Sequence, residues 1–151
     1  MIILFQFIYI YMIPLLPPYI YQMIDHLYIS DTRGFVYHDF FDMVINTTQL
    51  HNTNSGTIDK HQLTEKTIQL TIRVQPITTI HIVEDLCNEL VQTTQNHKKI
   101  LLYADSYDAS ALVVYTYLTT RYHFTKDDIR RMIMTRPYSN GLTLAFQMIL
   151  K

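Results

Sequence analysis

The chain has 151 residues, a formal net charge of −1 and a pI near 6.6. This length is enough for one domain with a sizeable buried core. The near-neutral charge gives no general attraction to nucleic acid or to an anionic membrane. We therefore expect a single-domain protein that does not bind nucleic acid.

Cysteine and histidine usage narrows the chemistry further. The single cysteine, Cys87, excludes an intramolecular disulfide and suits a reducing compartment. The seven histidines show no two-ligand spacing on a helix, and there is no glycine-rich phosphate loop. We therefore expect a cytoplasmic protein with no metal and no cofactor. Its wealth of isoleucine, tyrosine and asparagine would fit the AT-rich genome of a large DNA virus, in which case the cytoplasm is the host's.

The first 24 residues are almost wholly apolar or aromatic and contain no lysine or arginine. Pro14 would end a helix after about 20 Å, short of the roughly 30 Å of a bilayer core. A secretory signal also fits poorly, because no small-residue cleavage site follows. Three interpretations stay open: an extra strand or dimer contact, a weak membrane association, and an upstream extension with initiation at Met12 or Met23.

We favour the first interpretation and assign residues 1–17 to an apolar extension and residues 18–151 to the folded domain. Aromatic side chains are enriched at the centres of protein interfaces, and large apolar patches rarely stay exposed on a monomer. We therefore expect a contact with a protein partner, a homodimer being the favoured case, made by Phe5, Phe7, Tyr9, Tyr11, Tyr19 and Tyr21.

Short strands are expected along the first half of the chain. The sequence predicts them over residues 19–24, 27–30, 43–46 and 68–74, with a short helix over 36–41. The strand at 68–74 has the clearest signal, since its aliphatic residues alternate with polar ones. Residues 47–66 are polar and contain Asn-Ser-Gly, so we expect a mobile surface loop there.

Helices dominate the second half. One is expected from Thr78 or Thr79, another after Thr125, where Asp128 completes a capping box, and a last one over 142–150. An apolar run at 100–102, a short polar loop and an apolar segment at 111–118 lie between the first two. Strands that alternate with helices predict an α/β domain with a mainly parallel central sheet flanked by helices.

Residues 103–111, Tyr-Ala-Asp-Ser-Tyr-Asp-Ala-Ser-Ala, join the apolar run to the segment that follows. This layout resembles the phosphate loop of dual-specificity phosphatases, whose motif is His-Cys-x-x-Gly-x-x-Arg-Ser/Thr. Residues 26–30, 41–48 and 68–74 resemble three strands of that family, and Arg136-Pro137 with Asn140 and Phe146-Gln147 resembles its closing segment. The resemblance covers roughly residues 18–150 and implies a dual-specificity-phosphatase-like fold.

Laid on the family's motif, every chemically essential position is changed. The motif's histidine, cysteine, glycine, arginine and final hydroxyl fall in turn on Tyr103, Ala104, Tyr107, Ser110 and Ala111. The variable positions of the motif are Asp105, Ser106, Asp108 and Ala109. In the region of the family's general acid, the chain has Gln75 and Pro76.

These changes remove the family's chemistry. Alanine offers no thiolate to attack phosphorus, and serine replaces an arginine that would grip two phosphate oxygens. Asp105 and Asp108 would repel a phosphate dianion by about 4 kcal/mol per close charge pair at an effective dielectric of 20. Ser106 and Ser110 carry hydroxyl groups, but the loop holds no histidine or lysine to activate them as nucleophiles.

The sequence therefore predicts a catalytically inactive pseudophosphatase that acts as a protein-binding scaffold. Two other functions stay open: a membrane-peripheral structural protein anchored through residues 1–24, and a module that binds phosphoproteins. An enzyme that uses Asp105 or Asp108 with a metal is a less favoured alternative.

Overall fold

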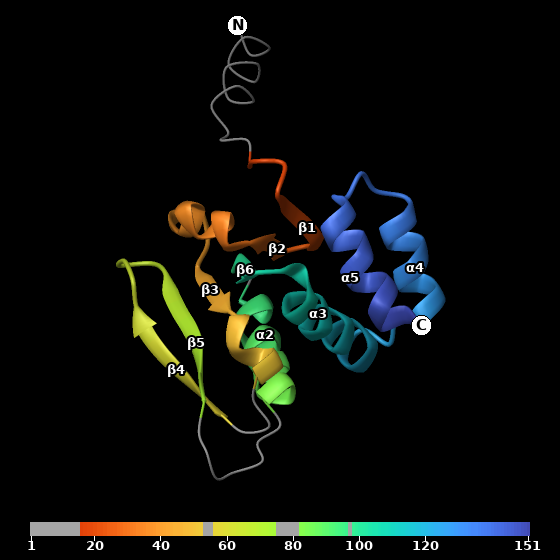
Figure 1. The fold of residues 1–151 in the computed structure, drawn as a ribbon. Helices are drawn as coiled ribbons and strands as arrows, with labels where there is room; N and C mark the ends of the chain where they lie inside the picture. Colours follow the sequence, from red (N-terminus) through yellow and green to blue (C-terminus); the bar gives the residue numbers. More distant parts are fainter. Residues whose placement is uncertain (1–15, 53–55, 75–81, 97) are drawn as a thin grey trace, which may run out of the picture.

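The computed structural model describes residues 16–52, 56–74, 82–96 and 98–151. Six strands of this described chain form one sheet in the order β1-β2-β6-β3-β5-β4 (Figure 1). The four central strands, β2, β6, β3 and β5, are mutually parallel, and antiparallel β1 and β4 close the two edges. The mainly parallel sheet is thus confirmed. The strands are β1 (Ile20–Ile24), β2 (Leu27–Asp31), β3 (Met43–Asn46), β4 (Gly56–Gln62), β5 (Ile68–Val74) and β6 (Ile100–Ala104).

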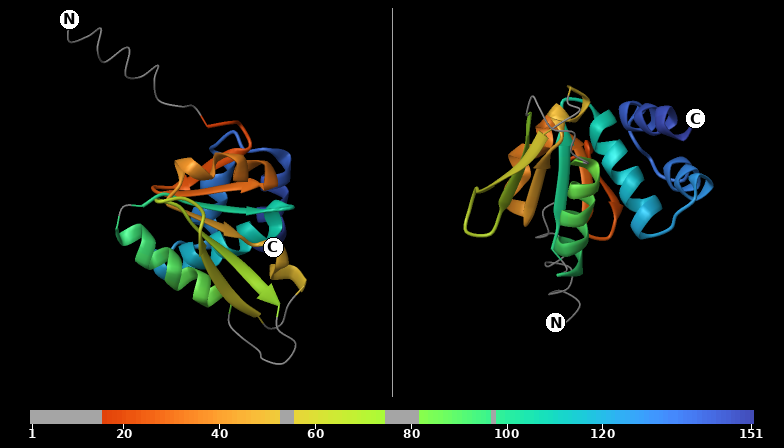
Figure 2. Two further views of the ribbon diagram at one scale, coloured as in Figure 1. Left: turned by 90° about the vertical axis from the view of Figure 1, so that its left-hand side faces the viewer. Right: turned by 90° about the horizontal axis from the view of Figure 1, so that it is seen from below.

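Helices cover both faces of the sheet. On one face lie α2 (Ile82–Gln95) and α3 (Tyr107–Arg121); α5 (Asn140–Leu150) packs on α3, with α4 (Lys126–Met134) beside it (Figure 2). The opposite face carries the 3-10 helix η1 (Thr32–Phe40). Because side chains alternate along a strand, Ile45 and Leu102 point into the core beneath α2 and α3, whereas Val44 and Leu101 point into a smaller core beneath η1.

The central strand β6 positions the segment that resembles a phosphate loop. All five of its residues are buried, because the strand has neighbours on both sides and helices on both faces. A parallel strand in that position needs a continuous apolar sequence, which Ile-Leu-Leu-Tyr-Ala supplies. Its last residue delivers Asp105 and Ser106 to the carboxyl edge of the sheet, where open α/β sheets place their ligand sites.

Local signals set the start of α4 as expected. Thr125 Oγ1 accepts a hydrogen bond from the Asp128 amide at 3.1 Å, and the Asp128 carboxylate accepts one from the Thr125 amide at 2.7 Å. This reciprocal pair is the predicted capping box. The bond from the Thr125 amide is also the largest cause of a lowered pKa for Asp128.

The sequence predicts a helix only from residue 36, but η1 begins four residues earlier. Asp31 caps it by accepting a hydrogen bond from the Arg33 amide at 3.0 Å. The helix then runs so close to β2 that a Cβ atom on Gly34 would collide with the side chain of Ser30. An aspartate is a favoured cap residue, so Asp31 was a signal for this earlier start.

The expectation of a mobile loop over residues 47–66 is wrong. The segment contains a second 3-10 helix, η2 (Thr48–Asn52), and all of β4, which pairs with the whole length of β5. Ile58 stands opposite Ile72, and Asp59 stands opposite Thr71. Most side chains of this edge strand are partly or fully exposed, so it needs few apolar residues and shows no alternating pattern.

Tyr21 and Tyr19 make contacts within their own chain. The Tyr21 ring lies 5.2 Å from that of Tyr138, and its hydroxyl accepts a hydrogen bond from the Ser139 amide at 2.8 Å. The Tyr19 ring lies 4.2 Å from the guanidinium of Arg33. Both tyrosines thus pack within their own chain, which from Ile20 adds a strand to its own sheet, and their part in an intermolecular contact stays a prediction.

The rest of the amino-terminal segment lies outside the described residues, so the domain division at residue 17 stays a prediction. No helix that the structure describes is long and apolar enough to cross a bilayer. The residues of the expected contact that lie outside the described chain are Phe5, Phe7, Tyr9 and Tyr11.

Arg136 occupies the outer edge of β1. Its Nη1 donates hydrogen bonds to the carbonyl oxygens of Gln22 and Met23, at 2.8 and 3.0 Å. Consecutive carbonyls of a regular strand point to opposite sides, so one donor reaches both only where the strand is irregular. The β1–β2 register does shift between Gln22 and Ile24.

Candidate functional site

The segment that resembles a phosphate loop lies at the carboxyl end of β6. Tyr103 and Ala104 end the strand, Asp105 and Ser106 form the connection, and α3 begins at Tyr107. Ala104 stands at the nucleophile position with 1% of its surface exposed. Its methyl group has no lone pair with which to attack a substrate, so the nucleophile's place holds a buried, inert side chain.

The backbone that follows is helical where a phosphate cradle needs a loop. Ser106 precedes the helix with extended geometry, and its side chain makes no capping bond. Because α3 begins at Tyr107, the amides of Ser110 and later residues already bond within the helix. Only Asp105 and Ser106 separate strand from helix, so any backbone contact with an anion is limited to these two residues and the first turn of α3.

Tyr107 occupies the position of the motif's glycine and fixes the start of α3. Its ring makes an edge contact with that of Tyr21, at 6.2 Å between centroids, and a Cβ atom on Gly141 would lie 3.3 Å from it. Its hydroxyl donates to the Tyr19 carbonyl at 3.2 Å. Burial, reinforced by the charge of Asp31, raises the pKa of Tyr107, so the hydroxyl stays a donor at neutral pH.

Ser110, at the arginine position, points into the protein. It is fully buried, and its Oγ lies 2.8 Å from Oγ1 of Thr47, the residue after β3. Thr47 Oγ1 donates to the Tyr103 carbonyl at 3.2 Å, so it accepts from Ser110. The Ser110 hydroxyl is therefore satisfied inside the protein and does not reach solvent, so it is not placed to bind a phosphate oxygen or to act as a nucleophile.

The other positions of the motif behave as parts of a helix start. Ala109 and Ala111 are buried in α3, and Asp108 is half-buried in its first turn, where the helix dipole favours a carboxylate. Asp105 and Ser106 are exposed. Cys87 on α2 offers no replacement nucleophile, because burial raises the pKa of its thiol to about 11.

Tyr103, at the position of the motif's histidine, belongs to a polar chain that crosses the sheet. Its hydroxyl accepts a hydrogen bond from Gln69 Nε2 at 2.7 Å, and Gln69 Oε1 lies 2.7 Å from Nε2 of His61. Since that amide oxygen can only accept, His61 Nε2 carries the proton. Burial raises the pKa of Tyr103, so this side chain ties β6 to β5 and β4 as a neutral phenol.

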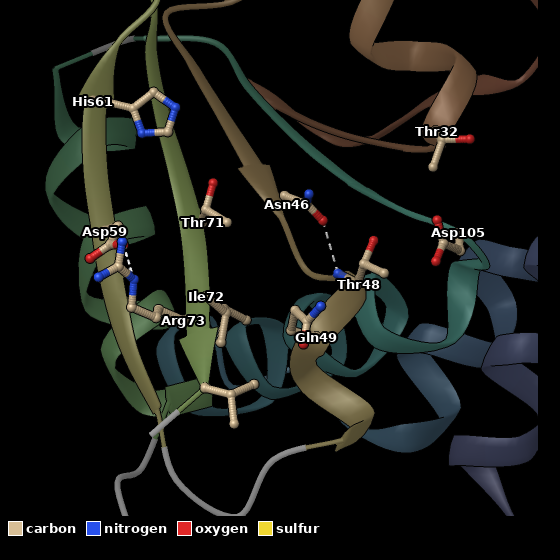
Figure 3. Close-up of a pocket in the computed structure, with 11 residues that line it drawn as sticks. Thr32, Asn46, Thr48, Gln49, Asp59, His61, Thr71, Ile72, Arg73 and Asp105 are labelled. Atoms are coloured by element: carbon tan, nitrogen blue, oxygen red, sulfur yellow. Dashed lines mark hydrogen bonds and ion pairs between the residues drawn. The ribbon is translucent and has the colours of Figure 1, made fainter. Parts of the chain in front are cut away.

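A polar pocket of about 690 Å³ lies beside Asp105 (Figure 3). Its walls come from η1, the end of β3 with η2, and the β4–β5 pair. Arg73 Nε and Asp59 Oδ2 form an ion pair at 2.8 Å across the pocket from Asp105. The one cationic side chain among the described lining residues is thus neutralised, while the Asp105 carboxylate is free to repel an anion.

This pocket was not predicted, because Asp59 and His61 come from the segment expected to be a loop. Its place at the carboxyl ends of parallel strands was the available signal. Gln75 and Pro76, the general-acid region, lie outside the described residues. Within the parts of the chain that the structure describes, no group of three histidine, cysteine or acidic residues could hold a metal ion.

Known structures share the fold of this chain. Human DUSP28 is 14% identical, with a TM-score of 0.56, over 89% of this chain and 94% of that one. A mouse putative dual specificity phosphatase, complexed with zinc tungstate, is also 14% identical, with a TM-score of 0.58, over 89% and 88% of the two chains. The chain has the dual-specificity phosphatase fold.

A third structure with this fold is the human tyrosine phosphatase-like serine/threonine/tyrosine-interacting protein. It is 13% identical, with a TM-score of 0.56, over 88% of this chain and 96% of that one. No family model matches the sequence, and no curated protein is similar to it. At identities this low the dual-specificity phosphatase fold alone is shared, and the function has to be argued from the chain's own residues.

Proposed function

We propose that the protein is a catalytically inactive pseudophosphatase that acts by binding other proteins. The observation that carries this proposal is the buried methyl group of Ala104 at the end of β6, at the position of the motif's nucleophile. The early start of α3 at Tyr107 supports it, because the amides of Ser110 and later residues bond within the helix and only those of its first turn stay available to an anion.

The neighbouring side chains do not restore the chemistry. Ser110 is enclosed by its bond to Thr47, and Cys87 is a buried thiol of raised pKa. Ser106 is exposed, but the loop around it holds no histidine or lysine to activate its hydroxyl. A dual-specificity phosphatase fold without a nucleophile at this position leaves the molecular surface as the source of specificity, which is why we favour a binding role.

The direct test is hydrolysis of an aryl phosphate and of a phosphotyrosine peptide by the purified full-length protein. We expect no turnover above a buffer blank, since the missing nucleophile alone costs orders of magnitude in rate. Preparations of a Ser106→Ala variant provide the matched control for contaminating phosphatases. Turnover that persists through purification and is lost in this variant would overturn the proposal.

Binding of oxyanions separates this role from that of a phosphoprotein-binding module. A ligand that binds only the folded state stabilises it by RT ln(1 + [L]/Kd). We expect millimolar phosphate, vanadate or tungstate to leave the melting temperature unchanged, because Asp105 repels anions and Arg73 is already paired. A saturable rise that disappears in a Ser106→Tyr variant would favour phosphoprotein binding instead.

We further propose that the protein self-associates through its amino-terminal segment and works in the cytoplasm. Support for self-association comes from the uncharged, aromatic sequence before residue 16, which would gain stability by burial against a second copy. Support for the cytoplasm comes from the single, buried cysteine.

A further inference from the structure

An apolar groove lies between α4 and α5, away from the carboxyl edge of the sheet. The two helices run antiparallel, because they are joined by a short link and Arg130 of α4 donates to the Leu150 carbonyl of α5 at 2.8 Å. The groove has a volume of about 340 Å³, within the range of pockets that bind ligands. Ile133, Phe146 and Leu150 contribute apolar surface to it.

One large apolar side chain stands exposed at this groove, and two others stand exposed on another face of α5. Met134 lines it and is 82% exposed, and on α5 Leu144 and Met148 are 59% and 61% exposed. Leu144 and Met148 are four residues apart and therefore lie on the same face of their helix. Exposed methionines occur often at binding surfaces, because the flexible thioether adapts to different partners.

The charged side chains that line the groove are basic. The described lining of the groove has two basic side chains, Arg130 and Lys151, and no acidic one. Asp127 and Asp128 pair with Arg130 and Arg131 on α4. Lys151 has no carboxylate partner within the described residues.

We propose that this groove binds an amphipathic helix of another protein, with acidic residues flanking the helix's apolar face. A channel between two antiparallel helices fits a third helix, whose apolar side chains at positions i, i+3 and i+7 would enter it. Acidic flanks would meet the basic rim, which raises the association rate and fixes the orientation. The proposal deepens the proposed binding role and rests on it.

Charge and shape favour this occupant over two others. A second copy would bring its own Arg130 and Lys151 against those of the first, and like charges repel. A helix that binds a membrane surface inserts an exposed apolar face into the lipid. The apolar residues here instead line a hollow between two helices.

The test is fluorescence anisotropy with the full-length protein and two labelled synthetic helices of about four turns. Both probes carry the same leucine stripe; one has glutamate flanks and the other lysine flanks. We expect the glutamate probe to bind at least about tenfold more tightly, with an affinity that falls as salt rises. Equal binding of the two probes, or no binding of either, would overturn the proposal.

Two variants locate the site. Met134→Glu places a charge at the groove and should weaken binding of the glutamate probe by at least about tenfold. Val36→Glu is the matched control, because Val36 is 77% exposed on η1, outside the groove, and its replacement should leave the affinity unchanged. Equal losses in both variants would refute the assignment, as would Met134-dependent binding to anionic lipid vesicles without binding of the probe.

The hydrolysis assay on the same preparations keeps the two proposals distinguishable. If the protein shows neither hydrolysis nor binding of the probe, the proposed binding at the groove is refuted and the proposed lack of catalysis is retained. Turnover together with Met134-dependent probe binding would refute the pseudophosphatase and leave the groove as a docking site. A dimer that dissociates in the Met134→Glu variant would assign the groove to a second copy and overturn the choice of occupant.

Discussion

Restoring an arginine at position 110 should damage the fold rather than rebuild a phosphate site. The Ser110 side chain is fully buried against Thr47, and arginine stays charged at every accessible pH. An uncompensated charge at such a site costs about 3–5 kcal/mol, and the larger side chain adds roughly 1–3 kcal/mol of overpacking. Domains have about 5–15 kcal/mol of total stability, so Ser110→Arg removes a large share of it.

Thermal denaturation followed by circular dichroism measures this loss. For a domain of about 150 residues, 1 kcal/mol lowers the melting temperature by roughly 2–4 °C, so Ser110→Arg should lower it by about 10–30 °C. Ser110→Ala removes one buried hydrogen bond, worth about 1 kcal/mol, and should lower it by a few degrees. Leu112→Arg is the control, because residue 112 is exposed on the same helix and its replacement should be nearly neutral.

A Ser110→Arg variant that melts within a few degrees of the natural protein would refute this reasoning. It would show that the first turn of α3 can unwind and turn residue 110 outward. Saturable phosphate binding by that variant would be the stronger form of the same refutation, because it would require the side chain at position 110 to face outward beside the first turn of α3.

Three further results are expected. Ala104→Cys alone should hydrolyse no aryl phosphate, because the thiol would be buried above a helical start; robust turnover would show that a working cradle exists. The full-length protein should scatter light as a dimer, and a chain starting at Pro17 as a monomer with unchanged circular dichroism; a monomeric full-length protein would contradict self-association. Asp128, whose pKa is lowered by the Thr125 amide, stabilises the fold above the ordinary aspartate pKa of about 3.9 and loses that effect as the pH falls through its lower folded value. The urea midpoint of Asp128→Ala should therefore lie below that of the natural protein at pH 7 and approach it near pH 2; a gap of equal size at both pH values would count against the capping box.

Elements with strong local signals were predictable. β6 is formed by its own apolar run, and α4 begins at its own capping residues, Thr125 and Asp128. The sequence places both elements within a residue or two of their positions in the structure. β4 was not predictable, because an edge strand is held by backbone hydrogen bonds to β5 and its half-exposed side chains show no period.

The same distinction applies to the candidate site. That Ala104 falls where the motif has its cysteine can be read from the sequence, since it concerns the identity of one residue. The orientation of Ser110 could not be predicted from the sequence. It depends on where α3 begins and on a hydroxyl partner, Thr47, that is 63 residues away in the chain. The pocket beside Asp105 was missed for a related reason: β4, which supplies one of its walls, carries no strand signal.

The bond of Arg136 to the edge of β1 limits how molecules of this protein can join. A foreign strand extends a sheet only by taking up the free carbonyl and amide groups of the last strand. At Gln22 and Met23 those carbonyls are already bound, and the shifted register bends the edge at the same place. A continuous sheet across two copies therefore cannot form through β1 without displacing a guanidinium group. A second copy that meets this edge has to pack by its side chains instead, and substitution of Arg136 would open a route to strand-mediated aggregation at β1.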